Sequence, residues 1–460
     1  MSRVQSLTGE FARRGFDSAT SAVKVWERWT ARAGAEPTVE LTAFDVAADP
    51  DQALDSLDRM AAAAPALVDN ILADAAWLDR LIRVLGGSSV LAQTLIRHPE
   101  KADVLRNEAG ARGADGWLEF FREATEVEPG RVVHGEEDKL RVANRVALIE
   151  IAGRDLSAED STLIVDDIAA ELSYVADAVL EQSLAYARDE VPGSDKARIA
   201  VLALGKTGAG ELNYISDVDV IYVAEPADGV ATDEAMSIAT RVAAAQARIC
   251  SAHTSEGTIW QVDAALRPEG KAGPLVRTLA SYRTYYEKWA KNWEFQAMLK
   301  ARPAAGDRDL GHEFVDLIAP HVWSAGERPD FVAEARAMRD RVISLIPPKQ
   351  VDYEIKLSQG GLRDTEFSVQ LLQLVHGRAD ERLRHRGTFG ALHALVENGY
   401  IGRADGAEMD EAYRFQRTLE HRVQLRRLRR THLVPDDESA LRQVARSLGL
   451  SSEKLMQTWR

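Results

Sequence analysis

The spacing of apolar residues predicts helices over most of residues 1–192. Between 65 and 85, apolar side chains recur at intervals close to the helical period, at Leu67, Ile71, Leu78, Leu81, Ile82 and Leu85. A second series steps by three and four residues and marks one face of a long amphipathic helix, at Ile164, Ile168, Leu172, Val175 and Val179. This region shows no strand-like alternation and is predicted to be a helical scaffold.

The pattern changes after the loop at 192–195, where Pro, Gly, Ser and Asp follow one another. Residues 199–204 (IAVLAL) and 218–223 (VDVIYV) are short runs rich in apolar and β-branched residues, which indicates two buried strands. Residues 233–252 have a helical pattern. Residues 258–266 (TIWQVDAAL) alternate apolar and polar positions and predict a third strand.

Helices return after this mixed segment. An aromatic-rich stretch at 281–300 is predicted to be helical, residues 353–357 indicate one more strand, and the chain is expected to be helical from 365 onward. The predicted fold is therefore mainly α with an inserted α/β core. Its expected regions are a helical N-terminal region (1–192), a core with a mixed sheet and a helical insertion (193–375), and a C-terminal helical bundle (376–460).

Composition narrows the functional class. The net charge is −15, from 57 Lys and Arg against 72 Asp and Glu, which argues against a general binder of nucleic acid or anionic membranes. One cysteine, Cys250, forms neither an internal disulfide nor a cysteine-rich zinc site. No apolar stretch approaches the ~20 residues of a membrane span, and the N-terminus lacks a signal-peptide core. The expected compartment is the cytoplasm.

The chemistry is concentrated between Gly205 and Asp219. Gly205-Lys206-Thr207 resembles the end of a phosphate-binding P-loop, but Ala200 stands where the leading glycine is needed, and 199–204 is an apolar strand. The P-loop interpretation is therefore rejected. The glycine-rich turn, with Gly208 and Lys206, can instead present backbone N–H groups and a cation to phosphates.

Two carboxylates at the start of the second strand indicate a metal site. Asp217 and Asp219 share one face of a strand, about 7 Å apart at Cα, and repel each other unless a cation lies between them. Oxygen ligands at this spacing suit Mg²⁺, and Asp263 on the third strand is a third candidate ligand for a two-metal site. The competing interpretation is that Asp217 and Asp219 cap a turn and Asp263 is an exposed strand residue.

Several long segments resemble one family. LGKTGAGELNYISDVDVIYV (204–223) and VDAALRPEGKAGPLV (262–276) resemble the nucleotidyltransferase core of the glutamine synthetase adenylyltransferases, two-headed enzymes of bacterial nitrogen control. Residues 91–105, 150–157, 286–307 and 355–377 resemble the same family. The resemblance implies a polymerase-β-like core. ELNYISDVD, with Asn213 where the other half typically has glycine, resembles the N-terminal half, which removes AMP from glutamine synthetase, so the chain is expected to be one half of a longer protein.

The resemblance implies the reaction and the roles of the residues. Inorganic phosphate would attack the AMP–tyrosine ester and release ADP. Asp217, Asp219 and Asp263 would be the catalytic metal ligands, most simply for two Mg²⁺ ions. The phosphate- or nucleotide-binding residues would be Gly205, Lys206, Gly208, Ser216, Arg267, Lys356 and Arg363. The implied partners are glutamine synthetase, a PII-type signal protein, phosphate, ADP and ATP.

Other interpretations remain open at this point. They are AMP transfer from ATP onto glutamine synthetase, a nucleic-acid nucleotidyltransferase, which the net charge disfavours, and a non-catalytic docking module. Glu366 and Asp364 form an acidic pair of open role. The basic run at 414–430 is interpreted as a solvated helix face or a surface for an acidic partner. The aromatic residues of 282–295 are interpreted as core or as a docking surface.

Overall fold

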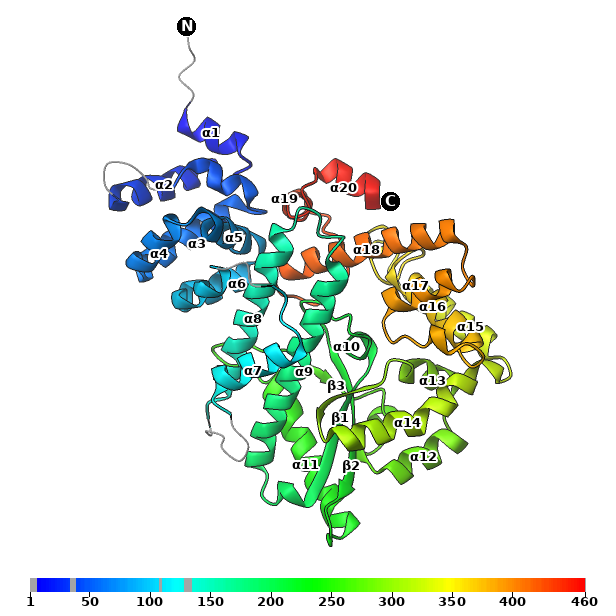
Figure 1. The fold of residues 1–460 in the computed structure, drawn as a ribbon. Helices are drawn as coiled ribbons and strands as arrows, with labels where there is room; N and C mark the ends of the chain where they lie inside the picture. The colour runs from blue at the N-terminus through cyan, green and yellow to red at the C-terminus, as the bar shows by residue number, and fades with distance from the viewer. Residues whose placement is uncertain (1–5, 34–38, 107–109, 128–134, 460) are drawn as a thin grey trace. The chain divides into compact units, whose positions relative to one another are not determined.

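The computed structural model describes residues 6–33, 39–106, 110–127 and 135–459 (Figure 1). The chain divides into two units, each built from stretches that are separated in sequence. Unit 1 comprises residues 1–110, 145–165 and 415–460, and unit 2 comprises residues 111–144 and 166–414. The division into three consecutive regions that the sequence suggests (1–192, 193–375 and 376–460) stays a prediction.

Helices make up the secondary structure described in unit 1. Their bounds are α1 (Leu7–Arg13), α2 (Ala19–Ala33), α3 (Pro50–Ala63), α4 (Pro65–Leu72), α5 (Ala75–Gly87), α6 (Ser89–Arg97), α19 (Glu438–Arg446) and α20 (Ser452–Trp459), with short 3-10 helices at Leu41–Val46 and Pro99–Leu105. The later parts of α8 (Glu137–Ser157) and α18 (Arg403–Leu425) also belong to this unit. The helix expected over 65–85 is two helices, because Asp74 accepts a hydrogen bond from the Trp77 N–H at 3.0 Å and starts α5 anew.

Unit 2 combines helices with the sheet. Its strands are β1 (Ala197–Ala203), β2 (Val218–Pro226), β3 (Val262–Asp263), β4 (Val276–Arg277) and β5 (Arg302–Gly306). Its helices are α7 (Ala114–Thr125), α9 (Val165–Glu190), α10 (Gly205–Ala209), α11 (Thr232–Ser251), α12 (Leu279–Lys288), α13 (Asn292–Met298), α14 (Arg308–Ser324), α15 (Phe331–Ser344), α16 (Leu362–His376) and α17 (Thr388–Glu397). The mainly helical chain with a small mixed sheet confirms the predicted fold class at that level.

The five strands form one mixed sheet. The strand order is β3–β2–β1–β5, and β4 also pairs with β2. β1 is antiparallel to β2 and to β5, whereas β3 and β4 run parallel to β2. β3 pairs with β2 at Val218 and Asp219, and β4 pairs with it further on, at Tyr222 and Val223.

Alternation along β1 and β2 gives the sheet two buried faces. Ala200, Leu202 and Leu204 pack with alternate residues of β2 into a core that also contains the aromatic rings of α12 and α14, including Tyr282 and Phe314. The intervening residues of both strands face the opposite side, where α11 lies (Figure 1). Cys250 on α11 is buried on this side, and burial raises the pKa of its thiol to about 12.

Several predicted elements differ from the structure. The strand expected over 258–266 is reduced to Val262–Asp263. It ends at Asp263 because Asp263 Oδ1 accepts a hydrogen bond from the Ala265 N–H at 2.8 Å and turns the chain out of the sheet. The expected helix at 281–300 is broken between α12 and α13. The expected strand at 353–357 is wrong, since a 3-10 helix at Val351–Tyr353 leads into a turn there.

The part of the basic run at 414–430 that lies on α18 is not a solvated helix face, whereas Arg427, Arg429 and Arg430 beyond the helix are exposed. α18 ends at Leu425, and a cluster of its polar side chains is buried, namely Arg417, Thr418, Glu420, His421, Arg422 and Gln424. Arg422 forms a buried ion pair with Asp155, with Nη1–Oδ2 and Nη2–Oδ1 distances of 2.5 and 2.8 Å. Charge pairing inside unit 1 therefore explains these residues, and the sequence pattern alone did not distinguish buried from solvated arginines.

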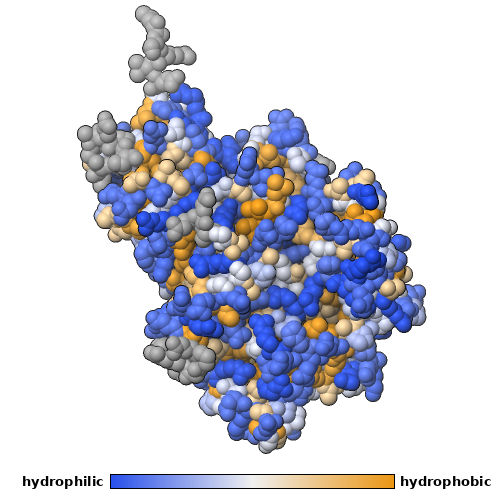
Figure 2. All heavy atoms as spheres, viewed as in Figure 1, coloured by the Kyte–Doolittle hydropathy of each residue, from blue (hydrophilic) through white to orange (hydrophobic). Residues whose placement is uncertain are grey.

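On the face drawn in Figure 2, hydrophilic residues predominate and hydrophobic ones form small scattered groups. None of the described helices is both long enough and apolar enough to cross a membrane.

The core between the sheet and α14 should dominate the stability of unit 2. Leu310 on α14 is fully buried in this core, whereas Leu345, after α15, is 74% exposed. We expect Leu310→Ala to lower the free energy of unfolding by about 2–5 kcal/mol, and Leu345→Ala to change it by less than about 0.5 kcal/mol. Chemical denaturation followed by circular dichroism measures both, and equal losses for the two variants would contradict this description of the core.

Candidate active site

Two acidic side chains meet where β2 and β3 begin to pair. Asp219 on β2 is in register with Asp263 on β3, and Val218 is in register with Val262. In-register residues on neighbouring parallel strands lie roughly 4.8 Å apart and point to the same face. The structure therefore brings together two of the three carboxylates predicted from the sequence.

The electrostatics of Asp219 reflect this arrangement. Burial and the nearby Asp263 carboxylate raise the pKa of Asp219 from its ordinary 3.8 to about 6, although Lys356, Arg363 and Lys300 act in the opposite direction. The charged form of Asp219 is thus disfavoured in the folded chain. A bound cation would relieve that cost.

Two glycines allow α10 to pack tightly beside these acids. Gly205 has a φ of +53°, and a Cβ on it would lie 2.1 Å from Asp219 Oδ2. A Cβ on Gly208 would lie 2.3 Å from the Lys300 carbonyl oxygen. The expected glycine turn is therefore one short helix, α10, and its glycines permit close approach that no side chain would allow.

A cavity of about 310 Å³ opens beside Asp219. This volume falls at the lower end of the range of ligand pockets. The cavity is lined by Gly205, Lys206, Ser216, Asp219, Leu266, Trp293, Gln296, Ala297, Lys300, Met338, Lys356, Arg363, Glu366, Phe367 and Gln370. All of these residues belong to unit 2.

Four cations surround a buried carboxylate in this cavity. Glu366 on α16 is 4% exposed. Burial alone would raise its pKa, but Arg363, Lys300, Lys206 and Lys356 outweigh that effect and lower the pKa to about 2. Its Oε1 is buried without a hydrogen-bond partner, and Arg363 Nε lies 3.9 Å from Oε2. The cations therefore exceed what one carboxylate can pair, and they favour a polyanionic ligand such as a phosphate chain.

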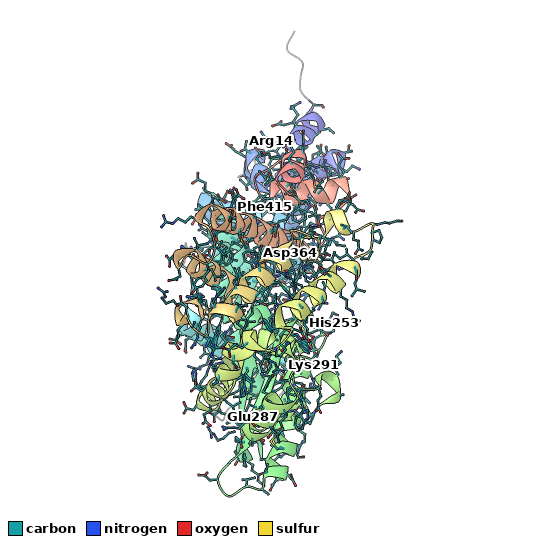
Figure 3. All side chains as sticks on the ribbon, turned by 90° about the vertical axis from the view of Figure 1, so that its right-hand side faces the viewer. Arg14, His253, Glu287, Lys291, Asp364 and Phe415 are labelled. Atoms are coloured by element: carbon teal, nitrogen blue, oxygen red, sulfur yellow. The ribbon has the colours of Figure 1, made fainter. Side chains whose placement is uncertain are left out.

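A turn held by several hydrogen bonds brings Lys356 and Arg363 together. The Arg363 N–H donates to the Lys356 carbonyl oxygen at 2.9 Å. Arg339 from α15 donates to the carbonyl oxygens of Leu357 and Ser358, both at 2.9 Å, and pairs with Asp364. Asp364, labelled in Figure 3, in turn accepts a hydrogen bond from the Gly360 N–H at 2.7 Å. Asp364 therefore holds the turn in place, which gives a structural role to one member of the Asp364–Glu366 pair.

Of the remaining predicted site residues, Ser216 lines the cavity, whereas Asp217 and Arg267 do not. Ser216 lines the cavity beside Asp219. Asp217 is half-buried and directly precedes β2. It does not belong to the described residues that line the cavity. Arg267 Nη1 donates to the Ala264 carbonyl oxygen at 2.8 Å and Nε to that of Pro274 at 3.1 Å, so its guanidinium holds the loop between β3 and β4. A phosphate contact by Arg267 stays a prediction.

Nine of the residues that line the cavity were not predicted as site residues. They are Leu266, Trp293, Gln296, Ala297, Lys300, Met338, Glu366, Phe367 and Gln370. The one signal for Lys300 was its position at the end of the aromatic-rich segment expected to be helical. The two glutamines gave no signal, since a lone glutamine on a helix is ordinary and its neighbour across the cavity is 74 residues away in sequence.

The carboxylate pair has the donor chemistry of a Mg²⁺ site. Asp219 and Asp263 supply hard oxygen ligands on one face, and their mutual repulsion favours a divalent cation between them. Within the described ranges, no group of three or more His, Cys, Asp and Glu side chains is arranged to hold a metal ion. Waters and substrate oxygens usually complete the coordination of Mg²⁺.

Comparison with protein families gives two matches along the chain. Residues 78–316 match the model of the glutamate-ammonia ligase adenylyltransferase family. Residues 336–460 match the model named GlnD PII-uridylyltransferase. The first match contains the whole sheet, and the second contains the turn with Lys356 and Arg363.

Curated relatives are similar over most of the chain. A bifunctional glutamine synthetase adenylyltransferase/adenylyl-removing enzyme of Cutibacterium acnes is 50% identical over 100% of this chain and 48% of its own length. Proteins of the same name from Streptomyces avermitilis and Mycolicibacterium smegmatis are 48% and 46% identical, over 98% and 82% of this chain and 45% and 38% of their own lengths. The chain spans about half the length of the curated relatives it matches or less.

Removing one charge of the acidic pair should stabilise the metal-free chain. We expect Asp219→Asn to raise the free energy of unfolding at pH 7 with a chelator present by roughly 1–3 kcal/mol, since the pKa of Asp219 is raised by about two units. The gain should shrink as the pH falls from 7 toward 4, because wild-type Asp219 then becomes protonated in the folded state.

Thermal or urea unfolding with and without Mg²⁺ measures this effect. Mg²⁺ should stabilise the wild type more than Asp219→Asn, because only the wild type keeps both carboxylates. Asp316→Asn, an exposed acid on α14, serves as the matched control and should behave like wild type. A variant less stable than wild type in chelator would show that the carboxylates do not repel each other as described.

Proposed function

The chain belongs to the glutamate-ammonia ligase adenylyltransferase family, and on that premise we propose that it removes AMP from adenylylated glutamine synthetase. The observation that carries the proposal is the in-register pair Asp219–Asp263 beside a cavity with four cations. A carboxylate pair next to a phosphate-binding surface is the arrangement that nucleotidyl transfer requires. The strand arrangement around it supports the assignment of a polymerase-β-like core.

The proposed reaction is phosphorolysis. An oxygen of inorganic phosphate forms a bond to the phosphorus of the AMP–tyrosine ester, and the bond from that phosphorus to the tyrosine oxygen breaks. The products are ADP and tyrosine, whose oxygen takes up a proton. Mg²⁺ held by Asp219 and Asp263, with Asp217 as a further proposed ligand, would offset the negative charge that gathers on the transferred group.

The chain's own cations have a defined task in this reaction. Lys206, Lys300, Lys356 and Arg363 bind and orient the phosphate oxygens of the nucleotide and of the attacking phosphate. Glu366 keeps these cations gathered when no phosphate is bound, because its buried carboxylate attracts all four. Ser216 lies at the same edge and is proposed to contact phosphate.

The direction of the reaction rests on one residue of the core motif. Asn213, the residue that resembles the AMP-removing half, is buried and its Oδ1 accepts a hydrogen bond from Lys206 Nζ at 3.4 Å. A glycine at this position, as in the other half, would lack this contact. The difference supports distinct placement of Lys206 in the two halves and favours the AMP-removing assignment for this chain.

The names of the curated relatives include both the addition and the removal of AMP. We also propose that a signal protein regulates this chain. The match of residues 336–460 to a PII-uridylyltransferase model supports a PII-type signal protein as a partner. Glutamine synthetase is proposed as the protein substrate, from the names of the relatives.

A labelled-nucleotide assay tests the proposed reaction. Glutamine synthetase carrying AMP labelled in the nucleotide is mixed with this chain, Mg²⁺ and inorganic phosphate, and the released nucleotide is identified. We expect labelled ADP whose release needs phosphate. Asp219→Asn and Asp263→Asn should each lower the rate roughly 100-fold or more, whereas Asp316→Asn should not change it.

The other outcomes separate the competing functions. Release of AMP would mean that water attacks in place of phosphate. Incorporation of label from ATP into unmodified glutamine synthetase would assign the chain to AMP transfer. The absence of both activities, with no Mg²⁺-dependent change in stability, would favour a docking module.

A further inference from the structure

The residues that line the cavity beside Asp219 are of two chemical kinds, which we call its charged end and its uncharged end. One end carries Asp219, Glu366 and the four cations. The other end is formed by α13, α15 and α16 and is lined by uncharged residues, namely Trp293, Gln296, Ala297, Met338, Phe367 and Gln370. The second end has no task in the phosphate chemistry described above.

Two glutamine amides pair at this uncharged end. Gln296 Nε2 on α13 donates a hydrogen bond to Gln370 Oε1 on α16 at 2.8 Å. Gln370 is 9% exposed. Within the described part of the chain, Gln296 Oε1 and Gln370 Nε2 form no other hydrogen bond, so the pair offers one acceptor and one donor at the wall of the cavity. Exchanging O and N in both amides would still leave one donor and one acceptor.

Flat apolar side chains stand beside the amides. Trp293 on α13 lines the cavity and is 37% exposed, so part of its ring is accessible to a ligand. Phe367, one turn before Gln370 on α16, has the Arg363 guanidinium over its ring, with Cζ 5.6 Å from the centroid. Arg363 therefore joins the two ends of the cavity, because it also lines the phosphate-binding end.

We propose that this uncharged end is the base subsite of the nucleotide, with the Gln296–Gln370 pair reading the edge of adenine. The inference rests on the proposed function, since it takes an adenine nucleotide as the ligand of the cationic end. The exocyclic amino group of adenine is a donor, and a ring nitrogen beside it is an acceptor. These groups complement Gln296 Oε1 and Gln370 Nε2, while Trp293 and Phe367 supply apolar surface for the ring.

The Gln296–Gln370 pair would also discriminate adenine from bases that lack its amino group. A site that hydrogen-bonds a ligand group rejects an analogue lacking that group, because its own polar atoms are then left unpaired. Gln296 and Gln370 are positioning and specificity residues in this account, and they do not touch the reacting phosphorus. Their substitution should therefore change affinity for the base and leave affinity for phosphates unchanged.

Calorimetric binding to the full 460-residue chain with Mg²⁺ tests the proposal. The ligands are ADP, inorganic pyrophosphate and the diphosphate of purine riboside, which lacks the amino group of adenine. The variants are Gln296→Met and Gln370→Met, which keep side-chain length and helix propensity, and Gln457→Met, an exposed glutamine of unit 1, is the control.

Three results are expected. Wild type binds ADP more tightly than pyrophosphate. Each cavity variant weakens ADP roughly five- to a hundredfold and leaves pyrophosphate binding unchanged, which also shows that the variant is folded. The preference of wild type for ADP over the purine riboside diphosphate disappears in Gln296→Met, because the acceptor for the amino group has been removed.

The contrary results are distinguishable. If wild type binds pyrophosphate as tightly as ADP, or if both variants keep the affinity for ADP, the base subsite is wrong and the phosphate site stands. If a variant loses pyrophosphate and ADP alike, the amide pair is structural and the inference is overturned. If wild type binds neither ligand, the proposed function fails together with the inference.

Discussion

The candidate active site depends on the register between β2 and β3, which sets two carboxylates side by side. Asp219 and Asp263 share one face because the two strands run parallel and pair at that position. The arrangement is unfavourable by itself, as the raised pKa of Asp219 indicates. It is maintained because β2 is held by β1 through seven in-register residue pairs and is covered on both faces by buried side chains. The stability of the core thus offsets a local repulsion that is useful only when a cation binds.

The cations of the site come from separate elements, and each is positioned by different contacts. Lys206 belongs to α10, whose approach to β2 needs the bare Cα of Gly205. Lys300 lies just before β5, and Lys356 and Arg363 are joined by the turn that Arg339 and Asp364 hold. The cluster is therefore a property of unit 2 as a folded whole. α16, which carries Arg363, also carries Phe367 and Gln370 at the uncharged end of the cavity.

Much of this was predictable from the sequence, and the rest was not, for physical reasons. Strands β1 and β2 were predictable because their apolar runs are buried on both faces. Asp219 and Asp263 were both predicted as metal ligands, but alternation placed Asp217 beside Asp219, and the register that pairs Asp219 with Asp263 was not predicted. β3 was predicted too long, because the pattern does not reveal that Asp263 ends its own strand by capping a turn. The buried charges of α18 were misinterpreted as exposed. The sequence does not reveal that Arg422 pairs with Asp155, which is 267 residues away along the chain. Glu366 and the glutamine pair depend on contacts between distant segments, which no local pattern encodes.

The central claim is that the Asp219–Asp263 pair binds the metal ion that a nucleotide needs in this cavity. Its most direct test is anomalous diffraction from crystals of the chain grown with Mn²⁺ and ADP, because the anomalous signal locates the ion itself. The account predicts a Mn²⁺ peak within ligand distance of both carboxylates and of phosphate oxygens of ADP, and no such peak for Asp219→Asn crystals. ADP bound in the cavity with Mn²⁺ elsewhere, or with no Mn²⁺ at the pair, would contradict it.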